Sequence, residues 1–145
     1  MAKPTAVQLV QPIADEFNLI EEPLPSTAAV ETIARVTAGA FRKSFGTWPF
    51  PEGIAEDRTI AYFVGVYAEP QNGPEAITYR NEVSQVLSQQ FDDLNGEVPP
   101  EANLDALERI TVGVLLTKSL PHPQAAPLAA SHYMAKLYLE GLEAT

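Results

Sequence analysis

Two histidines, His122 and His132, are the residues of this chain that could transfer protons near neutral pH or bind a metal ion. His122 lies between Pro121 and Pro123, and His132 follows ten residues later. A zinc site needs three or four ligands at characteristic spacings, and the chain has neither a cysteine nor an H-E-x-x-H sequence. We therefore expect no metal ion, no other cofactor, and no disulfide or thiolate chemistry.

Carboxylates in adjacent pairs are the next candidates for acid–base chemistry. The pairs are Asp15-Glu16, Glu21-Glu22, Glu56-Asp57 and Asp92-Asp93. Neighbouring residues on a helix point about 100° apart, so such pairs are poorly placed to share a proton. No serine has a G-x-S-x-G context, and the stretch from Gly39 to Gly46 lacks the G-K-[ST] ending of a phosphate-binding loop. These patterns favour a protein that is not an enzyme.

An aromatic loop at residues 45–53 holds the single tryptophan, Trp48, together with Phe50, Glu52 and two prolines. Prolines lower the entropy lost when a loop presents aromatic side chains to a partner, and tryptophan is enriched at binding hot spots. Two interpretations are open. Trp48 and Phe50 fill the core between the flanking helices, as such aromatics usually do, or they are exposed beside Glu52 and form a protein-binding patch.

Polar residues that are distant in the sequence could also converge into a ligand pocket. The candidates for its lining are Tyr62, Tyr67, Tyr79, Arg80 and His132. Such a pocket would make the protein a small helical enzyme or a ligand-binding protein. We keep this as an alternative, because one sequence does not exclude a site assembled by folding.

The formal charge of the chain is -10, and its middle third, residues 51–100, carries two basic against nine acidic residues. A field of this sign repels phosphate backbones and anionic lipid, so we expect no direct binding of nucleic acid or membranes. Solubility explains the charge best, and docking of a basic partner is the other explanation. An acidic inhibitor that mimics nucleic acid is a second alternative function.

The first residues lack the continuous apolar run of a signal peptide, and no uninterrupted apolar stretch approaches the roughly 20 residues of a membrane-spanning helix. We therefore expect a cytoplasmic protein. At 145 residues, the chain has the usual size of one domain.

Thirteen prolines divide the chain into segments whose apolar residues mostly recur with the period of a helix. We expect a short helix from Pro12 within residues 7–20, a helix from the N-cap Ser26 to Phe45, and helices over 74–94, 103–119 and 127–142. Gly96 should cap the third of these and Asn103 should be the N-cap of the fourth. Residues 53–69 fit a helix or a buried strand, and we favour the helix.

These elements predict an all-α protein, an irregular bundle of five to six helices joined by proline-containing turns around a single core. The domain should span residues 1–145, and looser packing of residues 1–25 is an open alternative. The small residues Ala34, Ala38 and Gly39 should let another helix approach closely. We expect a non-enzymatic protein-interaction module, such as a small adaptor, assembly or regulatory subunit, that binds a protein partner or a second copy of itself.

Overall fold

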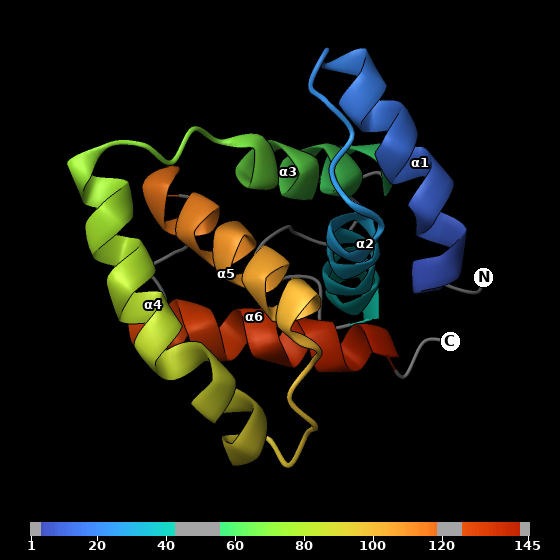
Figure 1. Ribbon diagram of the computed structural model, residues 1–145. Helices are drawn as coiled ribbons and strands as arrows, with labels where there is room; N and C mark the ends of the chain where they lie inside the picture. The colour runs from blue at the N-terminus through green and yellow to red at the C-terminus, as the bar shows by residue number, and fades with distance from the viewer. Residues whose placement is uncertain (1–3, 43–55, 119–125, 143–145) are drawn as a thin grey trace.

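Six helices make up the secondary structure of residues 4–42, 56–118 and 126–142, which are the residues that the computed structural model describes (Figure 1). They are α1 (Ala6–Leu19), α2 (Thr27–Arg42), α3 (Glu56–Ala68), α4 (Pro74–Asp93), α5 (Glu101–Leu116) and α6 (Pro127–Leu142). Buried apolar side chains from all six helices belong to one cluster. The predicted all-α bundle with a single core is therefore confirmed.

Helix α3 confirms the helical interpretation of the segment that could have been a strand. Ile60, Phe63 and Val64 are buried, whereas the neighbouring Gly65 is exposed. A strand would bury every second residue, but these positions share one face only in a helix. The proline starts were also predicted correctly, since Pro74 follows the N-cap of α4 and α6 begins at Pro127.

Helix α1 begins earlier than expected, and Pro12 is not its first residue. Thr5 is the N-cap: its Oγ1 accepts from the N–H of Gln8 at 3.3 Å, and the side chain of Gln8 accepts from the N–H of Thr5 at 3.0 Å. This capping box starts the helix, and Pro12 lies inside it. The core face of α1, which includes Leu9 and Ile13, continues on both sides of the proline.

Asn103 is not the N-cap of α5, because that helix starts at Glu101, with Pro100 before it. The Asn103 amide is buried and donates from Nδ2 to Thr32 Oγ1 at 3.1 Å and to Glu31 Oε1 at 3.2 Å. Asparagine is favoured at an N-cap because its side chain bonds to nearby backbone N–H groups. Here it bonds to α2 instead, and thereby joins two helices.

The C-terminal end of α4 also differs in detail from the prediction that Gly96 caps it. Asn95 takes the left-handed conformation, with φ of 58°, and the N–H of Gly96 donates to the Phe91 carbonyl at 2.8 Å. Together they form a Schellman-type ending, in which Gly96 follows the left-handed residue instead of being that residue itself. A Cβ on this glycine would overlap the end of the Leu139 side chain, which would have to move aside.

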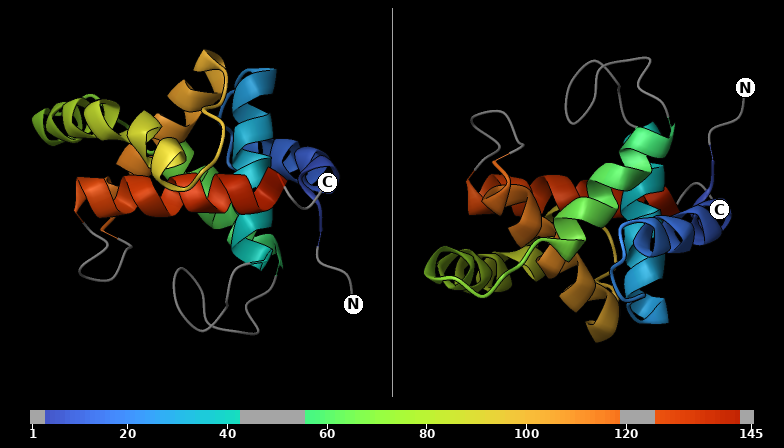
Figure 2. Two further views of the ribbon diagram at one scale, coloured as in Figure 1. Left: turned by 90° about the horizontal axis from the view of Figure 1, so that it is seen from below. Right: turned by 90° about the horizontal axis from the view of Figure 1, so that it is seen from above.

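Helix α2 lies at the centre of the bundle and packs against α1, α3, α5 and α6. It begins where expected, because Ser26 Oγ accepts from the N–H of Ala29 at 3.2 Å; its predicted end at Phe45 lies outside the described residues. Figure 2 shows α6 running across α2. At this crossing, a Cβ on Gly39 would collide with the Leu137 carbonyl, so the predicted close approach of a helix is confirmed.

Candidate functional site

The predicted aromatic patch of Trp48, Phe50 and Glu52 lies outside the described residues, because the structure describes nothing between residues 42 and 56. Its two interpretations, core and surface, both remain predictions. The candidate site is therefore sought among the six helices and the segments between them that are described.

Two of the five predicted pocket residues, Tyr67 and Arg80, come together in one concavity of about 440 Å³. It lies where the C-terminal end of α3 meets α4 and α5. Arg80 Nη2 donates to the Gln71 carbonyl at 2.7 Å, and Arg109 Nε donates to the Tyr67 carbonyl at 2.6 Å. The Arg109 guanidinium also lies 4.9 Å from the centre of the Tyr67 ring. Both cations thus interact with carbonyls at or just beyond the end of α3, where positive charge is favourable.

Two carboxylates, Asp105 and Glu108, share this concavity with the arginines. Partial burial raises the pKa of Glu108, the charge of Asp105 raises it further, and Arg80 lowers it. The charged groups therefore compensate one another, and the arginines are already held by backbone oxygens. Such an arrangement serves to attach the end of α3 to α4 and α5.

The other three predicted pocket residues, Tyr62, Tyr79 and His132, are not among the residues that line this concavity. The Tyr62 ring meets Phe63 edge to face at 5.0 Å, and Tyr79 packs against the core. His132 lies on α6 with its Nδ1 3.1 Å from Gln90 Oε1. This concavity therefore brings together two of the five predicted residues.

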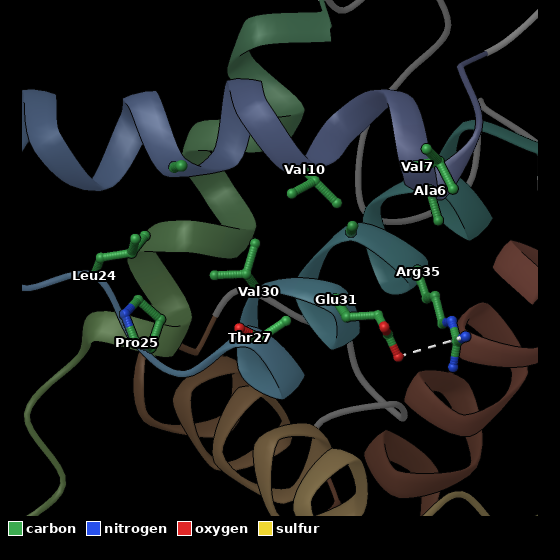
Figure 3. A pocket seen from close by; sticks show the side chains of 11 residues that line it. Ala6, Val7, Val10, Leu24, Pro25, Thr27, Val30, Glu31 and Arg35 are labelled. Atoms are coloured by element: carbon green, nitrogen blue, oxygen red, sulfur yellow. Dashed lines mark ion pairs between the residues drawn. The ribbon is translucent and has the colours of Figure 1, made fainter.

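An apolar groove of about 450 Å³ runs between α1 and the first half of α2 (Figure 3). Helix α1 contributes Ala6, Val7, Val10 and Ala14, the α1–α2 connection contributes Leu24 and Pro25, and α2 contributes Thr27, Val30, Glu31, Ala34 and Arg35. In Figure 3, Leu24 and Pro25 lie at one end of the groove and Ala6 and Val7 at the other. Three of the lining side chains are alanines, which leave the space between the helices unfilled.

Large apolar side chains of this groove are exposed to solvent. The exposed fraction is 74% for Val7, 40% for Val10 and 60% for Leu24. Single exposed apolar residues are common and need no explanation, whereas a group of them around a hollow is a candidate for contact with another molecule. The groove is accordingly the candidate interaction site.

One edge of the groove is polar, and its charges are already paired. Arg35 lies 3.5 Å from Glu31, its Nη1 donates to the hydroxyl of Tyr138, and its guanidinium lies 5.3 Å from the centre of the Tyr138 ring. Glu31 also accepts from Asn103. These contacts make Arg35 a fixed element of the wall, with little charge left to attract an anion.

The chain matches no known family model, curated protein or solved structure. Within the described ranges, no helix is long and apolar enough to span a bilayer. The same ranges contain no group of three or more His, Cys, Asp or Glu side chains placed to hold a metal ion.

The sequence does contain a signal for the groove. Helix α1 has a core stripe of Leu9, Ile13 and Phe17, and beside it a second apolar stripe of Val7 and Val10. One buried stripe is enough to attach a surface helix to a core. A second apolar stripe beside the core stripe predicts an unfilled contact, although its other wall on α2 is revealed only by the fold.

Proposed function

We propose that this chain is a non-enzymatic protein-interaction module whose partner binds in the groove between α1 and α2. The observation that carries the proposal is the exposure of Val7, Val10 and Leu24 around one hollow. Covering these side chains removes apolar surface from water, which is the main favourable term in most protein association. The adaptor, assembly or regulatory roles expected from the sequence are all roles of this kind.

The chemistry of the groove supports binding better than catalysis. Its charged members, Glu31 and Arg35, pair with each other and lie at one edge rather than facing the hollow from opposite sides. A catalytic pocket brings several free polar groups together around a reacting atom. In the concavity of Tyr67 and Arg80, the arginines are bonded to backbone carbonyls. No specific observation therefore favours a ligand-binding or enzymatic function over interaction with a protein.

Affinity capture from an extract of the organism that encodes the chain tests this proposal. The bait is the wild-type protein, the variant Leu24→Ser, or the variant Leu128→Ser. Leu24 and Leu128 are matched, because they are 60% and 57% exposed, but Leu128 lies on α6 and does not line the groove. We expect proteins captured by the wild type and by Leu128→Ser to be lost with Leu24→Ser.

Thermal unfolding of the three baits provides the control for folding. Substitution of an exposed leucine usually changes the free energy of unfolding by less than about 0.5 kcal/mol, so all three proteins should unfold at similar temperatures. Capture of the same proteins by all three folded baits would show that the groove is not the binding site. Capture of no specific protein by the wild type would argue against the function itself.

A further inference from the structure

We propose that the groove binds a basic amphipathic helix of a partner protein; this inference rests on the proposed function and specifies the chemistry of the partner. Two independent features lead to it. The first is the backbone of the groove walls, which determines the conformation of the occupant. The second is the charge around the groove, which determines the residues beside its apolar face.

The hydrogen bonding of the walls favours a helical occupant. Both long walls are helices, α1 and α2, whose backbone N–H and C=O groups are paired within the helices except at their ends. They have no strand edge to which an extended peptide could bond. A helix suits such walls, because its own backbone groups are already paired within the segment.

The spacing of the lining residues fits the same conclusion. Val7, Val10 and Ala14 on α1 are separated by three and four residues, and Thr27, Val30 and Ala34 on α2 repeat that spacing. Each wall thus presents a side chain about every 5.4 Å, the rise of one helical turn. An occupant with apolar residues at positions i, i+3 or i+4, and i+7 places its side chains between those of the walls.

The charge around the groove favours basic residues on the occupant. Glu21 and Glu22 are exposed and come just before Pro23 and Leu24 at one end of the groove. Glu31 and Arg35 on the α2 wall pair with each other and add no net charge to it. The whole chain carries a formal charge of -10, which steers cations towards it.

A second copy of this chain fits the groove less well than such a partner does. Two copies with a charge of -10 each repel one another, and no described helix combines an exposed apolar stripe with a cluster of basic residues. The same repulsion disfavours an acidic partner helix. A helix with positively charged residues complements the negative charge of this chain.

Synthetic helical peptides of about 16 residues, roughly four turns, are the probes for the test. All carry the same leucine stripe at i, i+3, i+4 and i+7, and the residues beside the stripe are lysine, glutamine or glutamate. Binding to the full chain is measured by fluorescence anisotropy at low and at physiological salt. We expect the lysine peptide to bind most tightly and the glutamate peptide most weakly, with a difference that shrinks as salt is added.

Two pairs of variants locate the binding. Leu24→Ser should weaken the binding of the lysine peptide about tenfold or more, as the loss of an apolar anchor does at other interfaces. Leu128→Ser should leave this affinity unchanged. The double variant Glu21→Gln with Glu22→Gln should weaken the binding of that peptide about threefold to tenfold at low salt, because two exposed carboxylates no longer attract its lysines. It should leave the glutamine peptide unchanged.

The matched control for charge is Glu82→Gln with Asp92→Asn, which removes the same charge from the exposed surface of α4. Helices α1 and α4 lie on opposite sides of the molecule in Figures 1 and 2. This control should change the binding of the lysine peptide by less than the double variant beside the groove does. Equal effects would mean that only the overall charge of the chain matters, and would overturn a basic contact at the groove.

Other outcomes separate the failure of this inference from the failure of the proposed function. Groove-dependent binding of all three peptides with equal affinity would overturn the basic partner while leaving the interaction module intact. If a lysine peptide interrupted by proline binds as tightly as the uninterrupted one, the occupant need not be a helix, and that part of the inference is wrong. A dimer in analytical ultracentrifugation that Leu24→Ser dissociates would identify a second copy as the occupant. Binding of no peptide, together with no groove-dependent capture, would argue against both.

Discussion

The side-chain amide of Asn103 is a buried polar group that bonds to α2 through Thr32 and Glu31. A buried polar group that loses its hydrogen-bond partner destabilises a fold more than an exposed polar group does, because water does not replace the lost bond. Ser131 provides a contrast on α6, since its buried Oγ has no hydrogen-bond partner among the residues that the structure describes. The two residues predict opposite responses to the removal of a polar group.

Asn103→Ala should lower the free energy of unfolding by about 1–3 kcal/mol, because three contacts to α2 are lost and the Thr32 hydroxyl stays buried. Ser131→Ala should leave it unchanged or raise it by up to about 1 kcal/mol, because it removes an unsatisfied hydroxyl. Urea unfolding followed by circular dichroism measures both. A destabilisation by Ser131→Ala as large as that by Asn103→Ala would show that the hydroxyl has a stabilising role.

At the scale of the elements, glycines set how closely the helices cross. A Cβ on Gly39 would meet the Leu137 carbonyl of α6, and a Cβ on Gly141 would meet the Arg35 carbonyl of α2. The crossing of α2 and α6 is therefore clamped by one glycine from each helix. Gly65 on α3 is different, since a Cβ there meets nothing within 4 Å.

Gly39→Ala should destabilise the fold by about 2 kcal/mol or more, because backbone atoms cannot move aside as a flexible side chain can. Gly65→Ala should instead stabilise it by about 0.5–1 kcal/mol, since alanine loses less backbone entropy in a helix. Thermal unfolding monitored by circular dichroism distinguishes the two. Equal effects of the two substitutions would contradict the close crossing of α2 and α6.

At the scale of the whole molecule, side chains of α1 belong to the same core as those of the other helices. Leu9, Ile13 and Phe17 are buried against α2 and α3, and they join the cluster that contains Leu107 of α5. A single core makes unfolding cooperative in domains of this size. The groove therefore lies beside a helix whose buried side chains belong to that core.

Leu9→Ala and Leu107→Ala should each lower the midpoint of one and the same unfolding transition, because both residues are fully buried. A loss of about 2–5 kcal/mol is typical of such truncations. Far-ultraviolet circular dichroism and calorimetry measure the transition. If residues 1–25 were loosely packed, Leu9→Ala would leave the main transition in place and produce an earlier, smaller one.

The sequence by itself determined the local features of this protein. The period of the apolar residues identified the helices, and prolines together with Ser26 marked several of their starts, because these signals act over only a few residues. The absence of cysteine likewise excluded disulfides without reference to the fold. The predicted start of the first helix at Pro12 was wrong. The residues before a proline decide whether it begins a helix or lies inside one, and here the capping box of Thr5 starts the helix before Pro12.

Tertiary structure alone decided which surfaces meet and which remain uncovered. Asn103 could bond to its own backbone or to α2, and the packing of α5 against α2 selected the second. Tyr67 and Arg80 came together without the other predicted pocket residues because side chains on separate helices converge only where those helices cross. The groove arose in the same way, because the arrangement of α1 on α2 left Val7, Val10 and Leu24 exposed around one hollow.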